Sequence, residues 1–121
     1  MPSKIIVAVT GASGSIYAKH LLDRLASLKN KPKEISLIFS ENGKKVWEYE
    51  IGSINYDSNA IHEYSYNDFF SPVASGSAVY DCMVIIPCSM GTLGRIASGT
   101  SDDLISRAAD VMLKERKKLI L

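Results

Sequence analysis

The sequence predicts an α/β fold with a mostly parallel sheet, and two observations carry this prediction. Apolar, β-rich runs alternate with stretches of helical periodicity along the 121 residues. The first run, Ile5 to Val9, is apolar throughout, which is typical of a strand covered on both faces in a parallel sheet. Because 46% of the residues are hydrophobic, the chain can build one core, and residues 1–121 are expected to form one domain.

The first half of the chain predicts a βαβ unit followed by a second helix. The expected strands are the β-rich runs 4–10, 34–40, 82–87 and 118–121. Between the first two, the stretch 16–29 places four leucines on one helical stripe: Leu21, Leu22, Leu25 and Leu28. Ser40 is a candidate N-cap for a helix that runs to about Glu50, and Gly52 is placed to end it. The connection 52–81 is polar and weakly periodic, so only a short strand or helix is expected there.

Two further helices are expected after the strand at 82–87. A short helix covers Thr92 to Ala97 and ends at Gly99. A longer one follows, with Ser101 as candidate N-cap and two aspartates, Asp102 and Asp103, in its positively polarised first turn. Its predicted buried face consists of Leu104, Ile105, Ala108, Val111 and Met112. The last run, 118–121, resembles the opening of a buried strand, and we therefore expect a domain truncated at its C-terminus.

Charge and cysteine content narrow the function classes. Fourteen basic and thirteen acidic residues give a net charge of +1, which disfavours nucleic acid or an anionic membrane as a partner. The first apolar run is too short for a signal peptide and no stretch approaches a membrane span, so a cytoplasmic location is expected. Cys82 and Cys88 have no matching Cys or His pair elsewhere, so they are expected to be free, buried thiols, and no metal site is predicted.

Two turns of small residues follow predicted strands, at 10–15 (TGASGS) and 87–92 (PCSMGT). A strand that passes directly into a helix leaves unpaired amides facing the turn, which suits a phosphate or the edge of a flavin. The first turn lacks the full GxGxxG spacing and the GK[ST] of a P-loop, and Phe39-Ser40 stands where a dinucleotide fold has an acidic residue. A ligand-free turn is the alternative for the first turn alone. Two such turns at one end of parallel strands favour a shared ligand crevice.

Two cations of the last predicted helix lie on one stripe. Arg107 and Lys114 are seven residues apart, nearly two helical turns, and project in about the same direction. Such a pair can line a phosphate site. The alternative is a solvated face on which Asp110 neutralises both cations.

Four ordered blocks of the chain resemble the UbiX-type flavin prenyltransferases, a family formerly labelled aromatic acid or octaprenyl-hydroxybenzoate decarboxylases of ubiquinone biosynthesis. The blocks are residues 9–14, 74–77, 86–93 and 107–116. The resemblance implies a flavodoxin-like, Rossmann-like three-layer αβα fold and FMN as cofactor. It further implies transfer of a dimethylallyl group from dimethylallyl phosphate to N5 and then C6 of reduced FMN, without a metal. The prenylated FMN would serve a UbiD-type decarboxylase, and the protein would be a homo-oligomer, a dodecamer built from trimers, with a site shared between subunits.

The same resemblance assigns site residues. Those on the flavin side are Gly11, Ala12, Ser13, Ser40, Ser89, Met90, Gly91 and Thr92. Ser13 would also lie near the reacting ring, and Glu50 would handle protons and position the prenyl group, a role that suits a carboxylate in a partly dry site. The alternative for Glu50 is an exposed glutamate at a helix end. Ser75 and Gly76 match the loop over the substrate, and Arg107 and Lys114 match cations near the prenyl phosphate. An Arg-Glu pair and a later Tyr with a cation, which the family also has, would lie beyond Leu121.

Two other functions are compatible with this fold. One is an FMN-dependent decarboxylase of the cysteine-decarboxylase type, which needs a histidine base, and the chain offers only His20 and His62. The other is a non-catalytic flavin carrier or assembly subunit, which would bind FMN without turnover.

Overall fold

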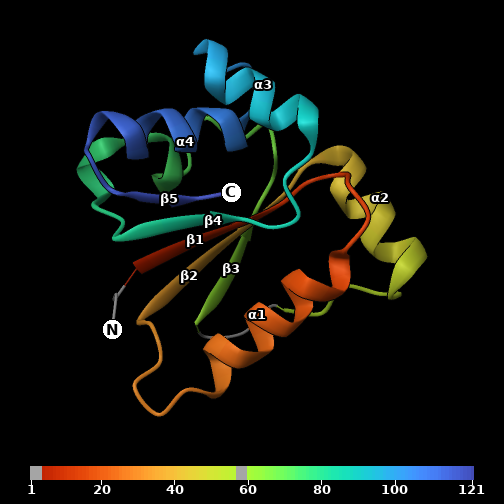
Figure 1. Cartoon of the computed structure of the whole chain (residues 1–121). Coiled ribbons are helices and arrows are strands. Elements are labelled where there is room, and N and C mark those ends of the chain that lie inside the picture. The colour runs from red at the N-terminus through yellow and green to blue at the C-terminus, as the bar shows by residue number, and fades with distance from the viewer. Residues whose placement is uncertain (1–3, 57–59) are drawn as a thin grey trace.

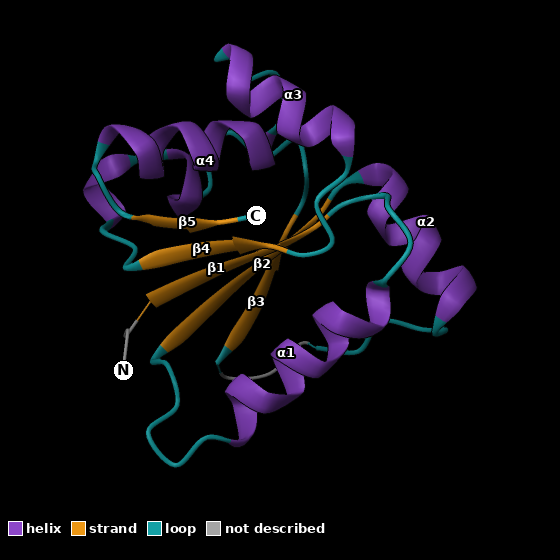
Figure 2. Cartoon of the chain, in the orientation of Figure 1, coloured by secondary structure: helices purple, strands orange, loops and turns teal. Residues whose placement is uncertain are grey.

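Five parallel strands form one sheet in the order β3-β2-β1-β4-β5. A computed structural model describes residues 4–56 and 60–121. The strands are β1 (Lys4–Val9), β2 (Glu34–Phe39), β3 (Ile61–Tyr64), β4 (Cys82–Ile85) and β5 (Lys118–Ile120). The helices are α1 (Ser15–Ser27), α2 (Glu41–Glu50), α3 (Met90–Ser98) and α4 (Leu104–Lys114). Helices α1 and α2 lie on one side of the sheet, and α3 and α4 lie on the other (Figures 1 and 2), so the predicted three-layer α/β architecture is confirmed.

The core consists of two clusters, one on each face of the sheet. Strand β1 contributes to both, because its side chains alternate between the faces and all five from Ile5 to Val9 are buried. Ile6 and Ala8 face α4, whose residues Leu104, Ile105, Ala108, Val111 and Met112 are buried as predicted. Val7 and Val9 face α1 and α2, where Leu22 and Trp47 are buried. Because β1 is buried on both faces, the segment that follows it at the carboxyl end of the sheet is held in a fixed position.

Most predicted element ends agree with the structure, and the differences have local causes. Ser40 is the N-cap of α2, and Gly99 ends α3 at φ +76°. Helix α4, however, begins one residue after Asp103, which replaces Ser101 as the N-cap. The Asp103 carboxylate accepts from the Ser106 amide at 2.7 Å, and the Ser106 hydroxyl accepts from the Asp103 amide at 3.3 Å. This capping box satisfies two amides, which a cap at Ser101 would not do.

The remaining boundaries shift by one to three residues. Helix α1 covers 15–27 where 16–29 was predicted, and α3 begins at Met90, two residues early, because Ser89 caps it. Strand β4 ends at Ile85, since Pro87 has no amide to donate to the ladder. The connection 52–81 contains strand β3 and two 3₁₀ turns, Pro72–Ala74 and Gly76–Ala78; its residues 57–59 lie outside the described ranges. Within those ranges, none of the helices is both long and apolar enough to cross a bilayer.

Candidate functional site

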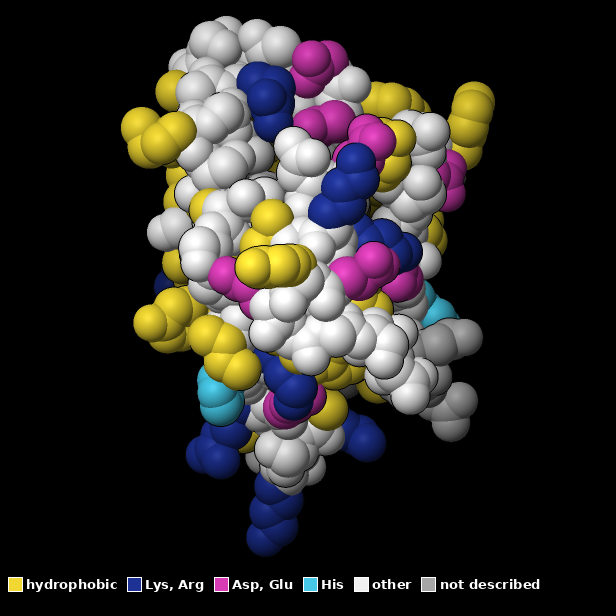
Figure 3. Space-filling model, turned by 90° about the vertical axis from the view of Figure 1, so that its right-hand side faces the viewer, with side chains coloured by type: hydrophobic (Ala, Val, Ile, Leu, Met, Phe, Trp, Pro, Cys, Tyr) yellow, Lys and Arg dark blue, Asp and Glu magenta, His cyan; other side chains and the backbone are white. Residues whose placement is uncertain are grey.

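A hollow of about 360 Å³ lies at the carboxyl edge of the sheet, the edge that Figure 3 faces. Its walls come from the segments that follow four strands: Gly11 after β1, Ser40, Glu41 and Asn42 after β2, Tyr66 after β3, and Ser89, Thr92 and Arg95 after β4, with Asp102 and Asp103 beside them. The order β2-β1-β4 places the helices after β1 and β4 on opposite faces, and open α/β sheets bind ligands at this switch point. The volume is in the range of small-molecule sites.

Glycines allow the first turn and the start of α2 to approach closely. A Cβ on Gly11 would lie 2.7 Å from the Cβ of Asn42, which is closer than real contacts allow. A Cβ on Gly43 would collide with the carbonyl oxygen of Val9. The Ser40 amide also donates to the Val9 carbonyl at 2.9 Å. The ends of β1 and β2 are therefore joined tightly, and Gly43, which sequence reasoning did not single out, is needed for this as much as Gly11.

A buried threonine joins the two small-residue turns. Thr10 is 1% exposed, and its hydroxyl donates to the Pro87 carbonyl and accepts from the Ser89 amide at 2.8 Å. Ser89 in turn caps α3, since its hydroxyl accepts from the Thr92 amide at 3.1 Å. The structure thus brings the two predicted turns together at one edge. Sequence analysis did not assign Thr10 a role; a hydroxyl at the end of an apolar strand was the available signal.

Glu50 closes the amino end of α1. Its carboxylate accepts from the Ser13 hydroxyl at 2.7 Å and from the amides of Gly14 and Ser15 at 3.2 and 3.1 Å. These hydrogen bonds, led by that from Ser13, lower the pKa of Glu50 below its ordinary value of 4.5, so the group is ionised at neutral pH. Glu50 is the last residue of α2 and is exposed, so it is a helix-end glutamate and does not lie in the partly dry site that was expected. Its hydrogen bonds nevertheless tie it to the first turn.

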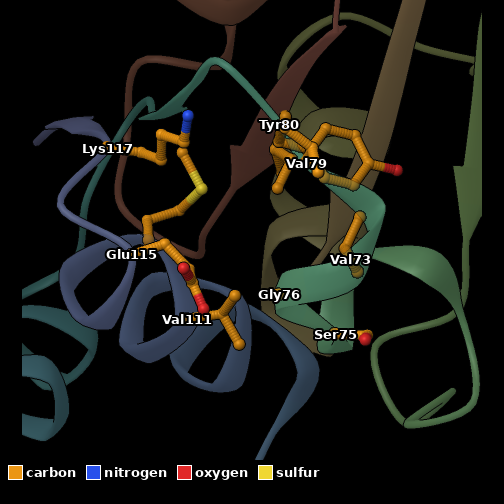
Figure 4. A pocket seen from close by; sticks show the side chains of 10 residues that line it. Val73, Ser75, Gly76, Val79, Tyr80, Val111, Glu115 and Lys117 are labelled. Atoms are coloured by element: carbon orange, nitrogen blue, oxygen red, sulfur yellow. The ribbon is translucent and has the colours of Figure 1, made fainter.

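The residues predicted to bind the prenyl donor do not line the hollow at the carboxyl edge. Ser75 and Gly76 line a second hollow of about 200 Å³ between the 3₁₀ turns and the end of α4 (Figure 4). Its wall is mainly apolar, with Glu115 and Lys117 at the α4 side. A Cβ on Gly76 would lie 2.5 Å from an Oε of Glu115, so this loop and the end of α4 are in close contact.

The cations of α4 do not form one cluster. The Arg107 Nε donates to the Ala74 carbonyl at 3.3 Å, which ties it to the loop that carries Ser75. Lys114 lies at the far end of the helix, where it pairs with Glu115 at 3.5 Å. Arg107, Asp110 and Lys114 are all exposed, so the solvated face of the alternative is present, but neither cation forms a described ion pair with Asp110. Arg107 thus contacts the residue before Ser75, and Lys114 contacts Glu115, which lines the hollow of Ser75 and Gly76; neither cation lines the hollow at the carboxyl edge.

Other candidate groups show no arrangement for chemistry. Both histidines are exposed, His20 on α1 and His62 on β3, and neither lines the hollow at the carboxyl edge. Cys82 and Cys88 are free, as predicted, but they are partly exposed and not buried; their partial burial raises the pKa of both thiols. Within residues 4–56 and 60–121, the His, Cys, Asp and Glu side chains form no group of three that could hold a metal ion.

Comparison with known proteins identifies the family. The flavoprotein family model matches residues 1–121. The flavin prenyltransferase UbiX of Methanocaldococcus jannaschii is 49% identical over 120 residues, which are 98% of this chain and 63% of that protein. The crystal structure of AnUbiX in complex with FMN and dimethylallyl pyrophosphate superposes with a TM-score of 0.87 at 42% identity, over 100% of this chain and 64% of the other.

A dodecameric FMN-dependent UbiX-like decarboxylase from Escherichia coli O157:H7 superposes with a TM-score of 0.88 at 39% identity, over 96% of this chain and 63% of that one. The chain therefore spans just under two thirds of the length of the relatives it resembles. Since the family model covers every residue, the chain belongs to the flavoprotein family.

Proposed function

We propose that this chain is the flavin-binding part of a flavin prenyltransferase. The protein would join a dimethylallyl group from dimethylallyl phosphate to reduced FMN and supply a UbiD-type decarboxylase. The observation that carries the proposal is the hollow at the carboxyl edge, where two small-residue turns and the amino ends of α2 and α3 meet. The relatives named flavin prenyltransferase and the AnUbiX complex with FMN and a prenyl diphosphate support it.

The residues around the hollow fit a flavin mononucleotide. The first amides of α2 and α3 provide donors for a phosphate, and Gly11 lets the first turn lie close to Asn42 in the wall of the hollow. FMN would supply the nucleophilic ring when bound. The chain's own residues would hold it at the turns 10–15 and 87–92, with Ala12, Met90 and Gly91 in those same turns and the ionised Glu50 on the Ser13 side.

The lowered pKa of Glu50 supports one proton role over the other. A carboxylate that is ionised at rest can accept a proton or stabilise a developing positive charge, and it is not a proton donor at neutral pH. We assign Glu50 the part of acceptor and of anchor for the Ser13 hydroxyl. Arg107 and Lys114 would stabilise the departing phosphate.

The prenyl-donor residues would reach the flavin from a neighbouring subunit. Within one chain, Ser75, Gly76, Arg107 and Lys114 lie apart from the hollow, and a UbiX-like relative is described as dodecameric. We therefore propose a homo-oligomer, a dodecamer, in which the α4 surface of one copy completes the hollow of another.

The direct test is mass spectrometry of the flavin after anaerobic incubation with reduced FMN and either dimethylallyl phosphate or dimethylallyl pyrophosphate. We expect a flavin heavier by one prenyl unit. Bound but unchanged FMN would instead indicate a flavin carrier, and loss of CO₂ from a peptide cysteine would indicate the cysteine-decarboxylase type. The exposed positions of His20 and His62 argue against that second function.

Shared sites can be tested by mixing variants. Glu50→Gln and Lys114→Ala each inactivate a different half of a shared site, so a mixed oligomer regains some sites with both residues intact. We expect the mixture to recover part of the prenyl transfer that each variant lacks. A mixture that stays as inactive as its components, with subunit exchange verified by native mass spectrometry, would refute the shared site.

A further inference from the structure

Arg95 is a cation placed at the amino end of a helix. It belongs to the last turn of α3, but its side chain runs back along the helix, as helical side chains do. One terminal nitrogen donates to the Thr92 hydroxyl at 3.3 Å. The other lies 3.5 Å from where a Cβ of Gly91 would be, so the glycine leaves space for the guanidinium beside the first turn.

This placement does not serve the stability of α3. A helix carries partial positive charge at its amino end, where a cation is unfavourable and an anion is favourable. Asp102 and Asp103 offset the charge only loosely, with nitrogen to oxygen distances of 3.8 and 3.6 Å, longer than hydrogen bonds. The Nε is enclosed and has no hydrogen-bond partner. Arg95 therefore keeps donors that these contacts leave unused.

The same guanidinium lines the hollow at the carboxyl edge. Among the described residues of that wall, Arg95 is the one cation, whereas Glu41, Asp102 and Asp103 are acidic. Ser40 and Ser89 mark the amino ends of α2 and α3 in the same wall. The amino end of α1 is already filled by the Glu50 carboxylate. An anion in this region can therefore accept hydrogen bonds from the first amides of α2 and α3. Because the three carboxylates repel it, a cation is also needed to offset their charge.

We infer that Arg95 binds the phosphate of FMN and selects the mononucleotide over riboflavin. The inference rests on the proposed function, which places FMN in this hollow, and it adds a residue that the sequence analysis did not assign. When the phosphate binds, the guanidinium donates to it in place of the loose contacts with Asp102 and Asp103. The planar fork of arginine suits a phosphate, which accepts two parallel hydrogen bonds.

The experiment compares FMN and riboflavin binding by flavin-fluorescence titration. Arg95→Ala and Arg95→Gln should weaken FMN binding by roughly 10- to 100-fold, the range for a hydrogen bond to a charged group, and change riboflavin binding less than about twofold. The glutamine variant keeps the length and loses the charge, so it remains informative if the alanine variant folds poorly. Arg24→Ala is the matched control, because Arg24 lies in the last turn of α1, away from the turn at 10–15.

Three results would overturn the inference. One is unchanged FMN affinity in both variants, and another is an equal loss for FMN and riboflavin, which would indicate a structural role. The third is recovery of FMN affinity in an Arg95→Ala/Asp102→Asn double variant, which would show that Arg95 only neutralises the carboxylate. If the unaltered protein binds riboflavin as tightly as FMN, Arg95 has no selective role although the hollow is a flavin site. If it binds neither flavin, the proposed function itself fails.

Discussion

Replacing Thr10 by valine tests whether one buried hydroxyl joins the two turns. The side chain is 1% exposed, and valine has nearly the same shape, so the change removes two hydrogen bonds without creating a cavity. The Ser89 amide loses the acceptor that it has at 2.8 Å, whereas the Pro87 carbonyl keeps the Thr10 amide at 3.2 Å. The cost is then that of one unsatisfied, partly buried donor, about 1 kcal/mol or somewhat more.

The measurements are urea and thermal unfolding of the wild type, Thr10→Val and Thr10→Ser. For a chain of this length, the expected loss lowers Tm by roughly 4–12 °C. Thr10→Ser keeps the hydroxyl and loses one methyl, which costs about 1 kcal/mol, so it should be more stable than the valine variant. It should also keep its flavin affinity, while Thr10→Val loses affinity because the start of α3 is no longer held at β1. A valine variant more stable than the serine variant would refute this account.

Three further predictions concern the same edge of the sheet. Glu50→Gln should lower the free energy of unfolding only where Glu50 is ionised. The stabilisation by the carboxylate is fully present above its ordinary pKa of 4.5 and disappears as pH falls through the lower pKa of the folded state. The unfolding curves of the two proteins should therefore converge in acid, and a difference that stays constant with pH would contradict this. Gly43→Ala should destabilise the protein by about 1–3 kcal/mol in denaturant titration because its Cβ meets the Val9 carbonyl, whereas Gly94→Ala, with open space around it, should be neutral or slightly stabilising. Glu50→Gln and Lys114→Ala should retain FMN and lose most prenyl transfer in the mass-spectrometric assay, and full turnover in both would return these residues to a structural role.

The sequence predicted the elements whose signals are local. The apolar run 5–9, the Ser40 cap and the five residues predicted to be buried on α4 all follow from patterns within one element, and the structure confirms them. The start of α4 was misplaced because 101–103 offers three adjacent capping residues. Tertiary structure decides between them, since the Leu104 amide donates to the Tyr66 carbonyl at 2.8 Å.

Long-range contacts of the candidate site left no local signal. Ser13 and Glu50 are 37 residues apart, and Thr10 and Ser89 are 79 apart, so no periodicity or spacing could pair them. The resemblance drew attention to Glu50, whereas Thr10 and Gly43 were missed. Arg107 and Lys114 both lie on α4, the predicted helix, but their partners could not be predicted from it, because the Ala74 carbonyl comes from the tertiary fold and Glu115 is the next residue.

The length of α4 explains why, within one chain, Lys114 lies far from the predicted flavin-side residues at the carboxyl edge. Asp103 lies at the hollow, and Lys114 is eleven residues further along the helix, an axial distance of about 16 Å. A lysine side chain cannot span that distance, and its helix is held against the sheet by a fully buried face. Rotation of side chains therefore cannot bring Lys114 to a flavin bound beside Gly11 in the same copy. If Glu50 and Lys114 act on one substrate from different subunits, as proposed, the mixture of Glu50→Gln and Lys114→Ala should restore transfer.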